Sequence, residues 1–304
     1  MKFDRKETTG YILIILASCF FGGSASLGKT LMQNGISTIM LMEARSILSS
    51  LILFPALLLV KRKHLRIARK DFLLFVLLAI PGLALVNASY YYAIKLLTVA
   101  MAVFLQFTAP VLVFIYGWVT GKEKFGREKI EALILSLAGT YLMVKLQQNG
   151  GTVSWVGVIS ALLSTMAYAF YVILSHELGK KYSPWTIISF GYGIAALFWC
   201  AIQNPFETSH VLSTNHLWTK AILFSIFSTL IPFVLFLSGL QRISPTGATI
   251  ASTSETVSAT LFAYLFLGES LATGQIAGAV LIVSAIALLT YRKARTVDGI
   301  SLTV

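Results

Sequence analysis

The chain has 304 residues, of which 57% are hydrophobic and 12% are charged, and its mean hydropathy is +0.80. Soluble globular proteins average about 45–50% apolar and about 25% charged residues, so these values exclude a soluble globular protein. The net charge of +12 does not indicate nucleic-acid binding, because the Lys and Arg residues lie in the gaps between apolar runs, as they do in membrane proteins.

Apolar runs of helix length follow one another along the chain. A helix needs about 20 mostly apolar residues to cross the hydrocarbon of a bilayer, and only helices or closed barrels satisfy the backbone there. The first half contains five such runs, at about 11–31, 37–60, 72–94, 98–119 and 129–146. The second half contains five more, at about 154–176, 184–203, 217–240, 245–267 and 272–291. We therefore expect an all-α integral membrane protein with ten transmembrane helices.

The basic residues test this count, because cytoplasmic loops of membrane proteins are rich in Lys and Arg. With the N-terminus in the cytoplasm, 19 of the 24 basic residues fall in segments expected inside. These are Lys2, Arg5, Lys6, Lys61, Arg62, Lys63, Arg66, Arg69, Lys70, Lys122, Lys124, Arg127, Lys129, Lys180, Lys181, Arg242, Arg292, Lys293 and Arg295. We expect both termini in the cytoplasm. Short termini without a sorting signal favour the plasma (inner) membrane of a bacterium.

The two halves of the chain resemble each other. The stretch 238–291, moved back by 146 positions, lies on 92–145 without a gap, so that Glu269 meets Glu123. The first spans of the two halves match at an offset of 147. A repeat with a period of half the chain predicts two related units rather than a solenoid.

We place these five-helix units at 1–147 and 148–304, with the polar turn 147–151 at the junction. Five is an odd number, so the two units cross the membrane in opposite directions. Inverted repeats are typical of secondary transporters, which hold a small-molecule substrate near the midplane between the repeats and expose it to each side in turn.

Several short motifs carry a family resemblance. They are Phe20 to Ser24 (FFGGS), Arg45, Thr108-Ala109-Pro110 through Gly121-Lys122-Glu123, and Ser254-Glu255-Thr256 through Gly268-Glu269. In this order the chain resembles the drug/metabolite transporter superfamily, with two tandem EamA-type domains. It departs from the usual pattern at Thr256, where the family generally has Pro, and at Lys122, an extra residue between Gly121 and Glu123. The resemblance implies carrier-type transport, often export, of amino acids, metabolites, nucleotide sugars or drugs.

Glu255 is the strongest candidate for a functional residue. It lies about ten residues into the ninth run, near mid-membrane at about 1.5 Å per residue. An ionisable side chain at that depth is costly and indicates function. Glu255 could carry a proton as the coupling ion or bind a cationic group of the substrate. The alternative is a packing role beside Ser254 and Ser258, which we include in the expected substrate site.

Four further charged or titratable residues are candidates for gating. Arg45 could hold a substrate anion, pair with Glu255, or extend to the membrane surface with its stem in lipid. Glu43 is two positions away, so the two side chains point to different sides of the helix and do not pair. Lys29 and His176 are equivalent in the two halves at an offset of 147; we expect them near opposite ends of the cavity.

Aromatic residues suggest the kind of solute. Polar and aromatic side chains expected to line the cavity are Asn87, Tyr91, Gln106, Tyr168, Tyr171 and Tyr192. A wall of rings with polar tips suits an amphipathic or aromatic solute. The alternative for such residues is a belt at the membrane interface, which explains the tryptophans better.

Small residues mark close helix packing. Gly274 and Gly278 lie on one face of the last run, and Ser136 and Gly139 on one face of the fifth. Faces of this kind bring helices together in membranes. They predict internal packing or, alternatively, the seam of a homodimer.

We therefore expect a secondary active exporter of small organic metabolites such as amino acids or amphipathic and aromatic compounds, working by alternating access. A channel or a receptor-like protein without coupled transport is the alternative. The sequence has no Walker loop and no hydrolase or metalloprotease motif. We therefore expect no catalytic residues, no cofactor and no metal.

Overall fold

The computed structural model describes residues 5–97, 99–124, 126–145, 154–267 and 272–299, and all of its regular elements are helical. The first half of the chain forms α1 (Arg5–Gln33), α2 (Thr38–Val60), η1 (Arg62–Leu65), η2 (Arg69–Asp71), α3 (Phe72–Leu77), η3 (Leu78–Ala84), α4 (Leu85–Leu96), α5 (Val99–Gln106), α6 (Ala109–Val119) and α7 (Arg127–Lys145).

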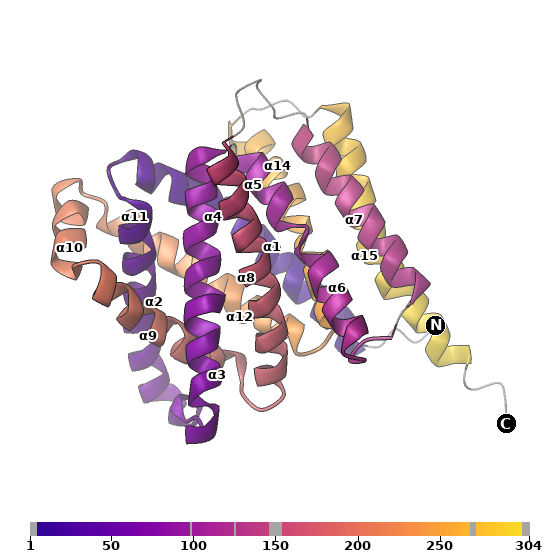
Figure 1. Cartoon of the computed structure of the whole chain (residues 1–304), viewed down its shortest axis with the longest axis horizontal. Helices are drawn as coiled ribbons and strands as arrows, with labels where there is room; N and C mark the ends of the chain where they lie inside the picture. Colours follow the sequence, from indigo (N-terminus) through magenta and orange to yellow (C-terminus); the bar gives the residue numbers. More distant parts are fainter. Residues whose placement is uncertain (1–4, 98, 125, 146–153, 268–271, 300–304) are drawn as a thin grey trace.

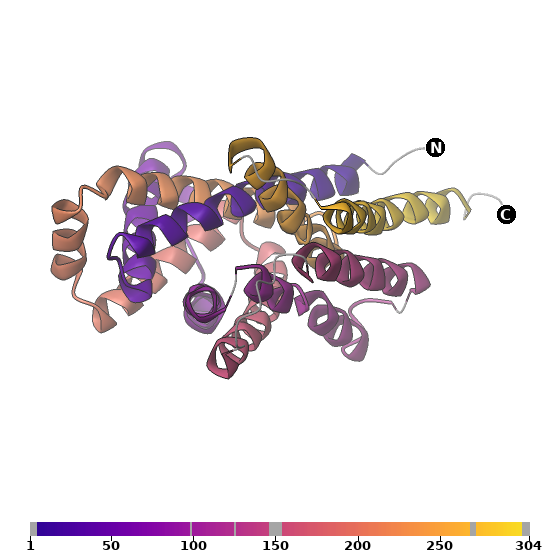
Figure 2. The same ribbon diagram turned by 90° about the horizontal axis from the view of Figure 1, so that it is seen from above.

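The second half forms α8 (Trp155–Gly179), α9 (Pro184–Ile202), α10 (Pro205–Thr214), α11 (Trp218–Ser225), η4 (Ile226–Leu230), α12 (Ile231–Leu240), α13 (Pro245–Ser252), α14 (Ser254–Leu267) and α15 (Thr273–Gly299). The start of α1 and the end of α15 lie at the same end of the molecule (Figures 1 and 2), as an even number of membrane crossings requires.

Helix breaks recur at equivalent positions in the two halves. The fourth span of the first half is divided into α5 and α6, and α5 covers 99–106. At an offset of 146 the second half has α13 over 245–252, followed after one residue by α14. The sequence repeat is thus a structural repeat, which confirms an all-α membrane fold built from two five-helix units.

The third span of each half contains a π-helical segment. In the first half this is η3, with Pro81 inside it. In the second half it is η4, which is followed at once by Pro232 in α12. Proline removes a backbone donor and its ring clashes with the preceding turn, so wider turns near these residues relieve a fault that a regular α-helix could not accommodate.

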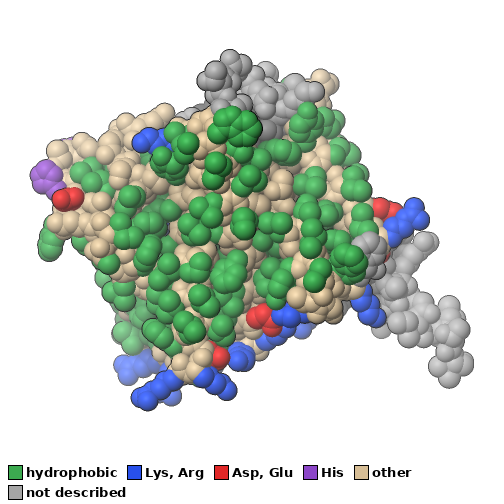
Figure 3. Space-filling model, viewed as in Figure 1, with side chains coloured by type: hydrophobic (Ala, Val, Ile, Leu, Met, Phe, Trp, Pro, Cys, Tyr) green, Lys and Arg blue, Asp and Glu red, His purple; other side chains and the backbone are tan. Residues whose placement is uncertain are grey.

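Many large apolar side chains are exposed on the surface of the molecule. Figure 3 shows hydrophobic side chains across the middle of one face and Lys and Arg side chains gathered along its lower edge. Large apolar residues such as Leu59, Val60 and Leu197 are more than two-thirds exposed. Water would penalise such a surface, whereas a bilayer does not.

Eight stretches of the described residues are long and apolar enough to cross a membrane. They are Arg5–Ser24, Thr38–Val60, Arg69–Leu96, Met101–Val119, Trp155–Gly179, Pro184–Ile202, Trp218–Leu240 and Thr273–Thr290. The expected fifth and ninth spans are helices that fall short of this measure. In α7, four of the first five residues are charged, and the described part of the ninth span ends at Leu267.

The two halves meet directly at α7 and α15, which lie side by side in both ribbon views (Figures 1 and 2). At their crossing a Cβ added to Gly139 would lie 2.7 Å from the carbonyl oxygen of Gly278, and one added to Gly278 would lie 2.6 Å from the carbonyl oxygen of Gly139. Only glycine allows backbones to approach this closely. These two predicted small residues therefore pack within the chain.

Candidate functional site

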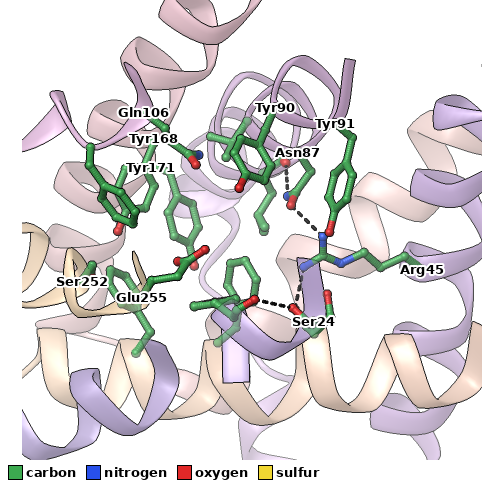
Figure 4. Close-up of a pocket in the computed structure, with 17 residues that line it drawn as sticks. Ser24, Arg45, Asn87, Tyr90, Tyr91, Gln106, Tyr168, Tyr171, Ser252 and Glu255 are labelled. Atoms are coloured by element: carbon green, nitrogen blue, oxygen red, sulfur yellow. Dashed lines mark hydrogen bonds between the residues drawn. The ribbon is translucent and has the colours of Figure 1, made fainter. Parts of the chain in front are cut away.

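A cavity lies between the two helical repeats. Its interior offers about 90 Å³ to the centres of water-sized molecules, enough for several waters. Helices from both halves contribute to its wall, as the close-up in Figure 4 shows. The lining residues are Phe21, Ser24, Arg45, Leu83, Val86, Asn87, Tyr90, Tyr91, Gln106, Phe107, Tyr168, Tyr171, Ser228, Phe233, Phe236, Ser252 and Glu255.

Glu255 supplies a carboxylate to one side of the cavity. The helix break at Thr253 starts α14 at Ser254, so Glu255 lies in the first turn of a new helix. The partial positive charge of a helix N-terminus favours an anion there. Figure 4 shows the side chain extending into the cavity. Among the described residues none forms a hydrogen bond or ion pair with this carboxylate.

Arg45 supplies a cation on the opposite side, and in the described part of the chain its guanidinium is held by neutral groups. Its Nε donates to Thr229 Oγ1 at 2.5 Å, Nη1 donates to Asn87 Oδ1 at 2.7 Å, and Nη2 donates to the carbonyl oxygen of Ser228 at 2.7 Å. Only 4% of Arg45 is exposed. The side chain therefore points into the protein rather than to the membrane surface, and in this conformation it is not paired with Glu255 (Figure 4).

Aromatic rings surround the Arg45 guanidinium. Its Cζ lies 5.4 Å from the ring centre of Phe224, 5.7 Å from that of Phe233 and 5.9 Å from that of Tyr192. Ring faces attract cations, so they partly replace the water that burial removes. Phe233 also meets Tyr192 edge to face at 5.6 Å.

Two hydroxyls on the cavity wall have no hydrogen-bond partner among the described residues. Tyr90 is 8% exposed and Tyr171 is 2% exposed, and both hydroxyls are buried without a partner. A buried polar group without a partner is destabilising. By contrast, the side chain of Gln106 is engaged, since it donates to Ser164 Oγ at 3.2 Å. A solute with acceptor groups could satisfy the two tyrosines.

Six of the nine residues expected to bind substrate line this cavity, and three do not. The six are Glu255, Asn87, Tyr91, Gln106, Tyr168 and Tyr171. Tyr192 packs against the Arg45 guanidinium and is not one of the residues that line the cavity. Ser254 donates to the carbonyl oxygen of Ala251, and Ser258 donates to that of Ser254. Both hydroxyls therefore bond to backbone carbonyl oxygens three or four residues earlier in the sequence.

The charged residues expected to gate the cavity lie apart from one another. Glu43 is fully buried and accepts a hydrogen bond from Thr208 of α10, while its Oε1 has no partner among the described residues. His176 Nδ1 lies 3.1 Å from the carbonyl oxygen of Leu240. Lys29 belongs to α1, and its side chain lies outside the described part of the structure.

Near His176 an ionic network joins the two halves at one end of the molecule. Lys122 lies 2.6 Å from Glu177, and this bond raises the pKa of the Lys122 ammonium. Glu123 is paired with Lys129 at 2.6 Å and accepts a hydrogen bond from the backbone N–H of Thr246, at the start of α13, at 3.2 Å. Its counterpart Glu269 lies outside the described residues.

Sequence reasoning missed several lining residues that the repeat itself points to. At an offset of 147, Tyr168 and Tyr171 correspond to Phe21 and Ser24. At an offset of 146, Gln106 corresponds to Ser252. Applying the offset to each expected residue would have found them. The carbonyl of Ser228 carries no side-chain signal and could not have been found in this way.

A fold of two inverted helical repeats around a cavity with unlike charges defines a membrane transport protein that crosses the bilayer several times. The model of the EamA-like transporter family matches residues 8–145 and 155–291. The chain belongs to this family.

Its relatives are transporters too. An uncharacterized transporter of Archaeoglobus fulgidus is 34% identical over 218 residues, covering 70% of this chain and 76% of that protein. The uncharacterized inner membrane transporter YicL of Salmonella typhimurium is 26% identical over 94% of this chain and 96% of its own length. The threonine/homoserine exporter RhtA of Escherichia coli K12 is 25% identical over 93% of this chain and 92% of its own length. A solved crystal structure matches the fold with a TM-score of 0.72 at 16% identity, covering 97% of this chain and 99% of the other.

Proposed function

We propose that the protein is a secondary active exporter that moves small organic solutes by alternating access around the cavity of Figure 4. One observation carries the proposal: the carboxylate of Glu255, which has no partner among the described residues, faces a cavity lined by both repeats. An unpaired buried carboxylate is unfavourable in a low-dielectric interior, so it needs a proton or a cationic ligand. Either partner gives the cavity a cargo or a coupling ion.

The lining favours amino acids or other amphipathic and aromatic compounds. Glu255 suits an ammonium group or a proton, and the tyrosine hydroxyls suit polar groups on a small solute. Tyr90, Tyr91, Tyr168 and Tyr171 provide apolar ring surface. The relative RhtA is named a threonine/homoserine exporter, which supports amino acids as the first compounds to test.

We further infer two five-helix units at 1–147 and 148–304, both termini in the cytoplasm, and a plasma-membrane location. The Lys and Arg side chains gathered along one edge in Figure 3 support this orientation. The chain functions as a carrier rather than an enzyme, and a homodimer is an assembly that its lipid-exposed helix faces allow. Among the described residues no group of three His, Cys, Asp or Glu could hold a metal ion.

Counterflow in proteoliposomes tests this proposal. Vesicles are loaded with unlabelled L-threonine or L-phenylalanine, and uptake of the same labelled amino acid is followed with and without a pH gradient. A carrier gives saturable counterflow. Flux that rises linearly with concentration and shows no counterflow would instead support a channel, and no flux of either amino acid would contradict this solute class.

A further inference from the structure

The Arg45 guanidinium connects the π-helical segments of the two halves. It bonds directly to η4, through the side chain of Thr229 and the carbonyl oxygen of Ser228. It reaches η3 through Asn87, which accepts from Arg45 and donates from Nδ2 to the carbonyl oxygen of Leu83 at 2.6 Å. Figure 4 shows the bond between Arg45 and Asn87 beside the cavity.

The two connected segments are the places where their helices depart from regular geometry. π-helical turns bond i to i+5 and are frequent at functional sites. Each segment is accompanied by a proline, Pro81 inside η3 and Pro232 just after η4. Helices bend at such faults. Arg45 thus joins the points at which the third span of each half is most easily bent.

The bonds around Arg45 are suited to being made and broken. All three acceptors are neutral, and no carboxylate among the described residues pairs with the guanidinium. A buried ion pair would be expensive to separate, whereas neutral acceptors can be exchanged one by one. With only 4% of Arg45 exposed, water does not compete for these bonds in the present conformation.

We propose that Arg45 is a positioning residue that clamps η3 to η4 and so holds the cavity in the conformation described here. These hydrogen bonds of Arg45 break when the protein changes conformation and the cavity opens to the other side of the membrane. The role of this clamp in transport rests on the carrier function proposed above. The test measures only the populations of the conformations and needs no solute.

Thr229→Val tests the clamp. Thr229 is fully buried and does not line the cavity, and valine keeps its shape while removing the hydroxyl that Arg45 Nε donates to. Pairs of nitroxide labels are placed in a background without Cys19 and Cys200, at Val60 and Val119 at one end and, in a second sample, at Lys95 and Thr219 at the other end. Double electron–electron resonance then gives the populations of the two conformations.

A hydrogen bond to a charged group corresponds to about a thirtyfold change in an equilibrium. We therefore expect Thr229→Val to shift the ratio of populations about thirtyfold away from the wild-type conformation at both label pairs. Thr229→Ser keeps a hydroxyl and should restore the wild-type distribution. Thr140→Val is the matched control, because the one bond of this buried hydroxyl among the described residues goes to the carbonyl oxygen of Ser136 in its own helix.

Unchanged populations in Thr229→Val, or an equal shift in Thr140→Val, would overturn the proposal. If Thr229→Val does not fold, Asn87→Leu removes the other arm of the clamp and should shift the populations in the same direction. If Thr229→Val shifts the populations as expected but neither L-threonine nor L-phenylalanine shows counterflow, the transport proposal is contradicted and the clamp proposal is supported.

Discussion

The cavity walls contributed by the two halves are similar in position and different in charge. At offsets of 146 and 147 from Arg45, the second half has Gly191 and Tyr192. At the same offsets before Glu255, the first half has Ala109 and Thr108. The cation therefore comes from one half and the anion from the other.

This difference separates the backbone shape, which the two halves share, from the charge of individual residues, which they do not. Features that depend on backbone shape occur twice, such as the divided fourth span and the π-helical segment of the third. The charged residues of the cavity wall, Arg45 and Glu255, each occur in one half. Shape is shared because both halves must bend and pack alike, whereas a solute with unlike ends needs unlike partners.

The largest effect is expected from removing the carboxylate of Glu255 from the cavity wall. Glu255→Gln should reduce L-threonine counterflow about thirtyfold, because a hydrogen bond to a charged group contributes about 2 kcal/mol, and should abolish its dependence on a pH gradient. Counterflow in proteoliposomes measures both. Glu207→Gln, on the exposed surface of α10, is the control. Normal proton-coupled transport by Glu255→Gln would rule out the proton-carrier role.

A smaller effect is expected where the two halves meet. Gly139→Ala would place its Cβ 2.7 Å from the carbonyl oxygen of Gly278, and overpacking of this kind costs about 2 kcal/mol. The apparent unfolding temperature in detergent should fall. Gly23→Ala is the matched control, since its Cβ would lie 3.4 Å from the ring of Phe262, an ordinary contact. Equal stability of the two variants would show that this crossing is not a tight point of contact.

Two equivalent helix caps offer a direct comparison between the halves. Ser37 caps α2 by accepting from the N–H of Met40, and Ser183 caps α9 by accepting from that of Thr186. Loss of either cap should cost about 1 kcal/mol. Ser183→Ala should be the more damaging, because Ser183 Oγ also lies 2.7 Å from His64 Nδ1. Thermal unfolding of the two variants measures the difference, and a greater loss in Ser37→Ala would contradict it.

The smallest effect concerns pH. Burial, together with Lys63 and Lys61, lowers the pKa of His64 below its usual 6.5. The folded protein therefore binds this proton less readily than the unfolded chain, so the contribution of His64 is present above about pH 6.5 and is lost as the pH falls below it. The apparent unfolding temperature should drop less in His64→Gln than in wild type between about pH 7.5 and about pH 5.5. A parallel drop in both proteins would contradict this.

Most of the fold could be predicted because hydrophobic length and charge placement are recorded directly in the sequence. The runs at 37–60 and 184–203, for example, correspond closely to α2 and α9. The divided fourth spans are a different case. In the first half Pro110 signals the break, because it lies in the first turn of α6. In the second half Thr256 stands in place of this proline and Thr253 carries no breaking signal of its own, so that break depends on how the helix ends pack against their neighbours.

For the site, the depth of Glu255 in the membrane could be predicted by counting residues along the span. The face of the helix on which its side chain lies could not. A continuous helix over 245–267 would fix its face relative to Ser252, and the break at Thr253 changes that relation. Three roles for Arg45 remained open in the sequence because each depends on which helix faces it. The structure brings it against η4, and a distant hydroxyl and a backbone carbonyl become its partners.

The placement of Arg45 and Glu255 in different halves has a consequence for how such a molecule can be assembled. Two identical copies of either half, related by a twofold axis, would present the same residue from both sides. Their cavity would hold two guanidiniums or two carboxylates, and like charges in a low-dielectric interior repel. A single polypeptide whose halves have diverged escapes this restriction, so covalent fusion makes a polarised cavity possible where a symmetric dimer of half-chains could not form one.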